Sequence, residues 1–362
     1  MRAKTVAAVV LLACIVGSAE SRAQSAPPVL DCSQLNDNYT DNTACAKSLL
    51  NRQSLINTST SIRHIILDRF DIGPNQTEPA GLELTDPTDI LERLTGSGEI
   101  SIAPTADVVA PAASPMWNIW IDGKYSWLDD TSAFTNLDGS LINTVVGADY
   151  KVTDRLVVGA MGTYETSDLK GLFSVTQETD GWGGGAYMGL TLTDNIVFSA
   201  NVLGTSLDTN ANNGAALFDS TRIQTSEAIT GYWYSGTWRF SPSLTFAWSK
   251  EWQDASAGLN AQTIETAIIS PAVQIGDTIA IKDATTVEPW VGAEIDWEVR
   301  NKVVDKVLGT ILNDPNTDLR LQTGLNFAFG SNAQLALTGE ISGLLLKDSD
   351  TYTAGANFAY QF

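Results

Sequence analysis

We predict an all-β protein: a twelve-stranded antiparallel transmembrane β-barrel, preceded by a short helical N-terminal region and a proline-rich linker. Three observations lead to this prediction. From residue 116 onward, apolar and polar residues alternate in twelve segments. Short and long connections alternate between those segments. Tryptophans gather near the segment ends, as in the aromatic girdles of membrane barrels.

Residues 1–23 are predicted to be a secretory signal peptide read by the Sec export machinery. Two basic residues precede a short apolar run, Thr5–Gly17, and cleavage fits before Gln24. The run is shorter than the roughly 20 apolar residues of a membrane-spanning helix. The alternative is lipidation at Cys14, because Leu-Leu-Ala-Cys resembles a lipobox.

Two cysteines, Cys32 and Cys45, remain after this cleavage. Exported proteins fold in an oxidising compartment, so we expect a disulfide that closes a small loop. The alternative is a pair of free, buried thiols.

Residues 24–72 are expected to form a short helical region, either a rudimentary passenger or a plug. Apolar residues recur at helical spacing from about Asn42 to Ile72, and Gly-Pro follows. Residues 73–115 contain six prolines and read as a linker. Asp86-Pro87 within it starts a possible short helix over 86–96.

Residues 116–362 carry the predicted barrel. In the last segment Phe358, Tyr360 and Phe362 share one face, while polar and small residues take the other. Short turns follow the even-numbered segments and longer loops the odd-numbered ones, as in outer-membrane barrels. A β-sandwich or a soluble barrel also alternates but leaves this parity unexplained. The expected strand starts are Met116, Gly139, Leu156, Thr176, Asn195, Thr221, Trp238, Thr263, Thr285, Asp318, Asn332 and Thr351.

Six tryptophans are expected at the two membrane interfaces, where their amphipathic rings are stable. They are Trp117, Trp120, Trp127, Trp238, Trp248 and Trp252.

The formal net charge of −21 and the single histidine limit the possible functions. An acidic chain is a poor nucleic-acid binder, and one histidine argues against His-based zinc sites and Ser–His–Asp catalysis. We therefore expect no enzyme, no cofactor and no metal. Asp314, Asn316 and Asp318 match part of a calcium loop, but its Gly and distal Glu are missing, so a solvated loop is favoured.

Charged residues on the polar faces of the strands are interpreted as lining a hydrated lumen. Paired carboxylates can also do acid–base work, which is the less favoured alternative. The lumen candidates are Glu288, Glu294, Asp296, Glu298, Arg300, Arg320 and Glu340, with Arg239 as a further counter-charge.

Five short motifs occur in order along the predicted barrel. They are Trp117–Gly123, Val146–Gly159, Gly184–Gly189, Glu288–Gly292 and Phe358–Phe362. With them, residues 116–362 resemble the translocator domain of bacterial autotransporters.

This resemblance implies a barrel in the outer membrane of a Gram-negative bacterium, in contact with outer-membrane lipid and lipopolysaccharide. It implies a helix in the pore, either 42–72 or 86–96. It also implies that Phe358, Tyr360 and Phe362 form the signal read by the barrel-assembly machinery. No nucleic-acid partner and a monomeric state are expected.

The function that we expect is an autotransporter-type barrel that anchors, and translocates or displays, a short N-terminal segment. The alternative is a small outer-membrane pore or structural barrel whose lumen is plugged by the N-terminal helix. The region before the barrel contains neither a Gly-Asp-Ser-Leu nor a Gly-x-Ser-x-Gly motif, and residues 42–115 lack an Asn-Asn pair. A catalytic or self-released passenger is therefore not expected.

Overall fold

The structure is a computed structural model of the 362-residue chain. It describes residues 39–70, 116–131, 136–171, 176–211, 214, 216–256, 259–282, 285–313, 315–346 and 349–362. The predicted signal peptide 1–23, the linker 73–115 with its 86–96 helix, and Cys14, Cys32 and Asp314 lie outside these residues.

One helix, α1 (Tyr39–Arg69), precedes fifteen strands. The strands are β1 (Trp117–Asp130), β2 (Leu137–Thr153), β3 (Leu156–Lys170), β4 (Thr176–Thr193), β5 (Ile196–Ala211), β6 (Ala216–Gly231), β7 (Trp233–Ser235), β8 (Trp238–Gln253), β9 (Gln262–Asp277), β10 (Ile279–Lys282), β11 (Thr285–Asp305), β12 (Gly309–Asn313), β13 (Thr317–Phe329), β14 (Ala333–Ser342) and β15 (Ser349–Gln361).

The strands form one closed antiparallel barrel. Each long strand pairs with its neighbours in the chain, and β15 returns to pair with β1 from Asn118↔Gln361 to Asp130↔Ser349. The short strands β7, β10 and β12 follow β6, follow β9 and precede β13 along the chain, and they pair with the ends of β8 and β11. The barrel therefore has twelve long strands, and the sequence prediction is confirmed. The largest difference is in β6, which begins at Ala216 rather than near Thr221.

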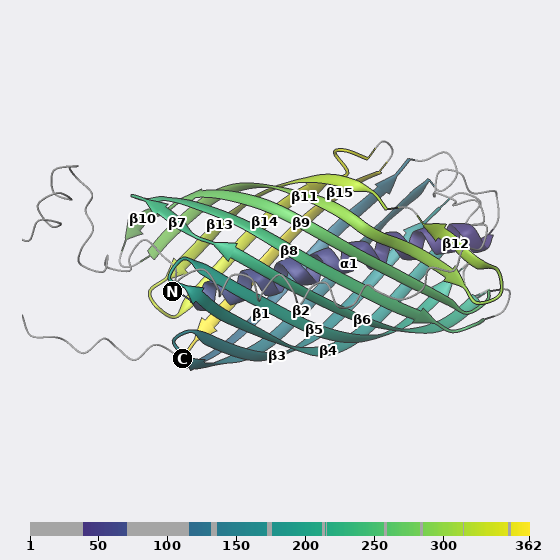
Figure 1. Cartoon of the computed structure of the whole chain (residues 1–362), viewed down its shortest axis with the longest axis horizontal. Helices are drawn as coiled ribbons and strands as arrows, with labels where there is room; N and C mark the ends of the chain where they lie inside the picture. The colour runs from purple at the N-terminus through teal and green to yellow at the C-terminus, as the bar shows by residue number, and fades with distance from the viewer. Residues whose placement is uncertain are drawn as a thin grey trace, which may run out of the picture.

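The two ends of the barrel differ. The end that holds Trp117 and Phe362 also holds the tight turns after β2, β4 and β13, and we call it the turn end. The opposite end, which we call the loop end, holds the longer connections and the hairpin of β11 and β12. In Figure 1 the chain's C-terminus lies at the left and β12 at the right.

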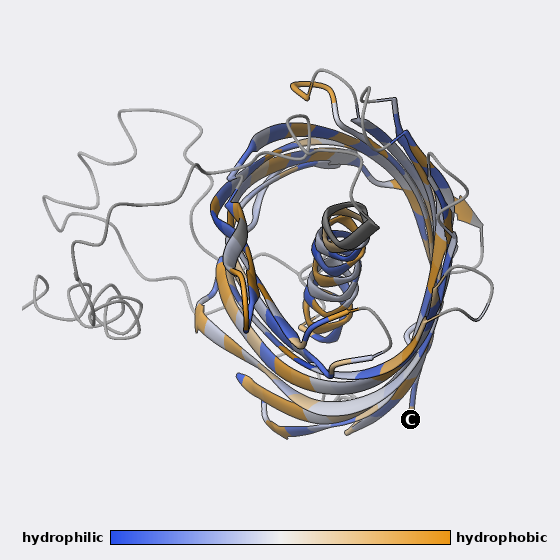
Figure 2. Ribbon diagram, turned by 90° about the vertical axis from the view of Figure 1, so that its right-hand side faces the viewer, coloured by the Kyte–Doolittle hydropathy of each residue, from blue (hydrophilic) through white to orange (hydrophobic). Residues whose placement is uncertain are grey.

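Along each strand the side chains alternate between the outer surface and the lumen, because successive residues of a strand point to opposite faces. In β5 and β6 nearly every second residue is buried. Figure 2 shows the resulting alternation of hydrophilic and hydrophobic residues around the ring. The outer positions hold large exposed apolar residues such as Ile121, Val202, Leu244 and Ile295.

The structure shows that Trp120 does not belong to the predicted girdle. Trp117, Trp127, Trp238 and Trp252 are exposed on the outer surface. Trp120 points into the lumen and is 4% exposed. Trp120 lies between Ile119 and Ile121, which face outward, and successive residues of a strand point to opposite faces.

Helix α1 lies inside the barrel, along its length (Figures 1 and 2). It contacts β1 to β6, β8, β9, β11 and β12. Its polar residues are as buried as its apolar ones, because the barrel wall surrounds it. Within the described residues, no helix combines the length and the apolar character needed to cross a membrane.

Candidate functional site

The candidate site is the lumen, where cationic side chains of α1 meet carboxylates of the wall. Near the loop end, Lys47 Nζ lies 2.8 Å from Glu251 Oε1 on β8. One and a half turns further along, Arg52 Nε lies 2.5 Å from Glu298 Oε1 on β11, and its Nη2 lies 3.3 Å from Asp318 Oδ2. All five side chains are at most 9% exposed. Burial removes a charge from water, which is unfavourable unless a partner of opposite charge offsets the loss.

The second half of α1 repeats the pattern. Arg63 Nη2 lies 3.5 Å from Glu294 Oε2 on β11. Arg69, in the last turn, places its Nε 2.6 Å from Asp149 Oδ1 on β2. The four cations Lys47, Arg52, Arg63 and Arg69 therefore bind five different carboxylates from the loop end to the turn end, which fixes the helix along its whole length.

Polar uncharged residues of α1 fill the gaps between these ion pairs. The Asn57 side-chain amide donates to Asn143 Oδ1 at 2.7 Å, and the Ser61 hydroxyl donates to Asp122 Oδ1 at 2.5 Å. The Ser249 hydroxyl donates to Asn51 Oδ1 at 2.6 Å. Such contacts satisfy polar groups that the lumen hides from solvent. The helix is matched to the wall by hydrogen bonds as well as by charge.

Two cations of the wall also reach the helix. Arg222 on β6 pairs with Glu165 on β3 and donates to Ser54 Oγ at 3.0 Å. Lys124 on β1 donates to Thr60 Oγ1 and lies 3.5 Å from Glu340 Oε1 on β14. These two cations therefore join α1 to strands that are not direct neighbours in the wall.

Most sequence-predicted lumen residues point inward and interact there. Arg320 on β13 gathers three carboxylates: its guanidinium lies 3.0 Å from Glu294, 2.9 Å from Asp296 and 3.2 Å from Glu340. Nearer the turn end, Arg239 Nη2 lies 2.6 Å from Glu288 Oε1. Glu298 binds Arg52 of α1, as described above.

Arg300 is the exception, and its interpretation as a lumen residue is wrong. Its side chain is 50% exposed, and its Nε lies 2.9 Å from Glu265 Oε2. The register of β11 on β9 shifts between Glu298 and Arg300, so the regular alternation breaks at this bulge. An extra residue in one strand turns the following side chain to the other face.

A pair of aromatic rings near the turn end was not predicted from the sequence. Trp120 Nε1 donates to the Tyr187 hydroxyl at 2.6 Å, and that hydroxyl donates to Asp149 Oδ2 at 2.8 Å. The ring of Trp120 covers Gly147 so closely that a Cβ there would overlap it, and Tyr187 covers Gly159 in the same way. The glycines at these two wall positions could have indicated that rings lie flat against the strands.

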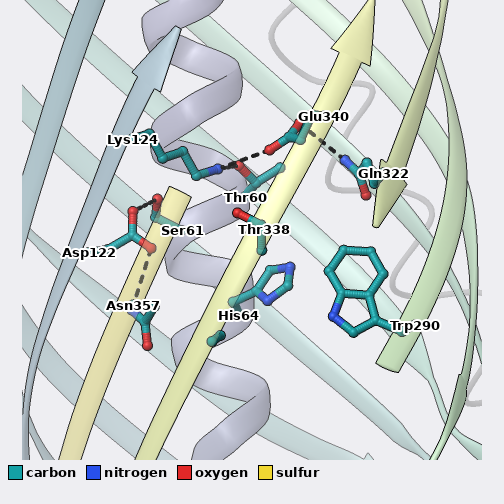
Figure 3. Close-up of a pocket in the computed structure, with 11 residues that line it drawn as sticks. Thr60, Ser61, His64, Asp122, Lys124, Trp290, Gln322, Thr338, Glu340 and Asn357 are labelled. Atoms are coloured by element: carbon teal, nitrogen blue, oxygen red, sulfur yellow. Dashed lines mark hydrogen bonds and ion pairs between the residues drawn. The ribbon is translucent and has the colours of Figure 1, made fainter. Parts of the chain in front are cut away.

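A small cavity of about 20 Å³ lies between α1 and the wall (Figure 3). His64 and Trp290 face each other across it, with ring centroids 6.0 Å apart. Lys124, Glu340 and Gln322 border the same space, and Asp122 joins Ser61 at its edge. No group of three or more His, Cys, Asp or Glu side chains that could hold a metal ion occurs among the described residues.

Apolar residues pack around the start of α1 near the loop end. Ala44 and Cys45 pack against Ile264, Val303 and Leu312. Cys45 is disulfide-bonded. Cys32, its predicted partner, lies outside the described residues, so the pairing stays a prediction.

The three predicted assembly-signal residues lie on the outer surface of β15 and just after it. Phe358, Tyr360 and Phe362 are all more than 40% exposed. The rings of Tyr360 and Phe362 stack, with centroids 6.3 Å apart. They form an apolar strip at the turn end, next to the seam between β15 and β1.

Comparison with known proteins identifies one family and several solved structures of the same fold. Residues 119–340 match the family described as Autotransporter beta-domain. No curated protein matches the chain. The β domain of the Bordetella autotransporter Brka is similar in structure, with a TM-score of 0.54 and 14% identity over 68% of this chain and 100% of that one.

Two further solved structures are similar. The translocator domain of autotransporter NalP from Neisseria meningitidis has a TM-score of 0.52 and 13% identity over 76% of this chain and 96% of that one. The transport unit of AIDA-I from Escherichia coli has a TM-score of 0.50 and 12% identity over 71% and 93%. At these identities the likeness is one of fold.

Proposed function

Because this chain belongs to the autotransporter β-domain family, we propose that it anchors itself in the outer membrane and displays the segment upstream of α1 at the cell surface. The family is one of outer-membrane translocator barrels of Gram-negative bacteria. The observation that carries the proposal is the direction of α1. Its first described side chains lie at the loop end, and Arg69 lies at the turn end.

The loop end is the outer end in this proposal. Outer-membrane barrels have short periplasmic turns and longer extracellular loops, and both strand termini of this barrel lie with the short turns. The chain before Tyr39 then emerges outside the cell.

Export by the Sec machinery and insertion by the barrel-assembly machinery belong to the same proposal. The basic and apolar pattern of residues 1–23 supports the first. The exposed aromatic strip that ends at Phe362 supports the second. Lipid and lipopolysaccharide would contact the apolar outer surface.

Protease access on intact cells tests the display. A protease site inserted before Leu35 should be cut from outside, whereas the same site inserted between Asp154 and Arg155, in a turn at the turn end, should be cut only after the outer membrane is permeabilised. Cutting of the upstream site only after permeabilisation would place that segment in the periplasm and reject the display.

A plugged pore is the second candidate, favoured by the way α1 fills the lumen. Five buried ion pairs and the apolar packing around Cys45 hold the helix in place. Wall carboxylates such as Glu251 and Glu298 would line an open aqueous path if the helix left. In this candidate the helix acts as a plug whose removal opens a conducting pore, which a bilayer measurement tests.

A further inference from the structure

Glu227 is a carboxylate on the lipid-facing side of the barrel. It lies on β6, where the adjacent Ser226 and Ala228 are buried in the lumen, so the Glu227 side chain points outward. Across the ladders it faces Ala200 on β5 and Phe246 on β8. The position is therefore part of the outer surface.

The depth of Glu227 is close to the middle of the apolar belt. Toward the turn end, the Trp233 ring covers Gly231 at the end of β6. Toward the loop end, Trp252 pairs with Thr221. We take the levels of Gly231 and Thr221, beside these tryptophans, as the two membrane interfaces. Strands tilted about 45° rise about 2.4 Å per residue along the membrane normal. Glu227 therefore lies about 10 Å from the interface at the turn end and about 14 Å from the interface at the loop end.

The surroundings of Glu227 are apolar except for Thr225, its outward neighbour on β6. The outward side chains nearest to it on β5, β6 and β8 include Phe198, Val202, Ile229 and Leu244. Within the part of the chain that the structure describes, no hydrogen bond or ion pair reaches its carboxylate. An ionisable side chain facing lipid at this depth is unfavourable unless it is paired.

Glu265 provides the contrast. It also points outward, but it lies near the loop end and accepts a hydrogen bond from Trp248 Nε1 at 3.2 Å. Its Oε2 lies 2.9 Å from Arg300 Nε. Glu265, near the loop end, is thus paired, whereas Glu227 at mid-depth has no partner among the described residues.

We propose that Glu227 marks a lateral interface where a second copy of this chain docks, the two Glu227 carboxyl groups facing each other. Both copies insert in the same direction, so the two-fold axis that relates them runs along the membrane normal. Such an axis brings identical residues together at identical depth. This departs from the monomer expected from the sequence.

The chemistry of a carboxyl group favours a second copy over a cationic partner chain. A protonated carboxyl both donates and accepts a hydrogen bond, so two of them are complementary to each other. Facing each other inside the membrane, they satisfy one another without any cation. The apolar side chains around them exclude water and strengthen the pair.

The surface beside Glu227 allows close approach. Ala200 lies directly across from it, and Gly204 lies further along β5 with open space where a Cβ would stand. Gly204 pairs with Gly184 on β4, which also faces outward. Small residues let two backbones come together in a membrane.

Cysteine cross-linking in outer-membrane fractions tests the interface. Glu227→Cys should give a disulfide-linked dimer on oxidation. Ala356→Cys is the matched control, because it also points outward but lies on β15, six strands away in the twelve-strand ring. Equal dimer yields for both variants, or no dimer for Glu227→Cys, would overturn the proposal. Heat-modifiable migration verifies that both variants are folded.

Mass measurements on the purified protein in lipid nanodiscs give a second readout. The unmodified chain should be a dimer, and Glu227→Gln should remain one because two amides also pair. Glu227→Leu should dimerise about 3- to 20-fold more weakly, the range known for hydrogen bonds between membrane segments. A monomeric unmodified chain, or a dimer that Glu227→Leu leaves intact, would reject the interface.

Discussion

Arg69 and Asp149 form an ion pair that fastens the last turn of α1 to the wall at the turn end. Arg69 Nε lies 2.6 Å from Asp149 Oδ1, and both side chains are almost completely buried. The same guanidinium donates to Gln361 Oε1 at 2.9 Å and to the Met116 carbonyl oxygen at 3.1 Å. One side chain therefore joins the helix to β2, to the last strand and to the residue that precedes the first strand.

Replacing Arg69 by Gln is expected to destabilise the barrel and free the end of the helix. Removal of one partner leaves Asp149 as a buried charge without its cation, which costs about 3–5 kcal/mol. The midpoint of heat-modifiable gel migration should fall. Arg155→Gln is the control, since Arg155 pairs with Asp194 at the exposed surface, where ion pairs contribute little. Equal midpoints for the two variants would contradict the role of Arg69.

Gly147→Ala is expected to lower stability by about 1–3 kcal/mol, the usual range for overpacking. The added methyl group would overlap the Trp120 ring, which is held by its hydrogen bond to Tyr187. Gly123→Ala is the matched control, because a Cβ at Gly123 meets open space. Urea unfolding of the refolded variants in detergent measures both. A smaller loss for Gly147→Ala than for Gly123→Ala would show that Trp120 moves aside freely.

Deletion of residues 39–69 is expected to raise single-channel conductance in a planar bilayer and to make the current cation-selective. The deletion removes Lys47, Arg52, Arg63 and Arg69 and leaves their wall carboxylates facing the lumen. Rings of carboxylates favour cations. Unchanged conductance would contradict the proposal that α1 plugs the pore.

A charge-neutralised version of the helix-free barrel is the companion measurement. Glu251→Gln with Glu298→Gln removes two carboxylates whose cations leave with α1. The preference for cations should decrease while the conductance stays high. A reversal potential that does not move would mean that selectivity arises elsewhere in the barrel.

Phe362→Ala is expected to reduce the amount of barrel assembled in cells several-fold while leaving the stability of refolded protein within about 0.5 kcal/mol, as for a surface change. The ring is 58% exposed and contributes little packing. Phe329→Ala is the control, a comparably exposed ring at the turn end of β13. Equal loss of assembly in both variants would argue against a terminal signal.

Much of the barrel could be predicted from the sequence because a strand with one lipid face and one lumen face alternates with a period of two. The pattern located β3, β4, β8 and β11 at their first residues. The bulge before Arg300 could not be predicted from the sequence. It changes the facing of one side chain without changing composition, and it arises from how β11 pairs with β9.

The candidate site was predicted in kind but not in its pairings. Carboxylates such as Glu294 and Asp296 were recognised as facing the lumen, because they share the polar face of one strand. Arg320 was also recognised as a lumen residue, but its pairing with Asp296 and the pairing of Arg63 with Glu294 were not predicted, since Arg320 comes from another strand and Arg63 from α1. Side chains this far apart in the chain meet only after the barrel closes.

The sequence by itself determined where the strands run, which face of each meets lipid and which end carries the long loops. These properties are local, because they follow from the two-residue period and the lengths of the connections. Only the tertiary structure decided that α1 fills the lumen with Lys47 at the loop end and Arg69 at the turn end. It alone also set Glu227 apart, because closing the barrel paired charges such as Lys47 and Arg69 with carboxylates of distant segments and left Glu227 facing lipid.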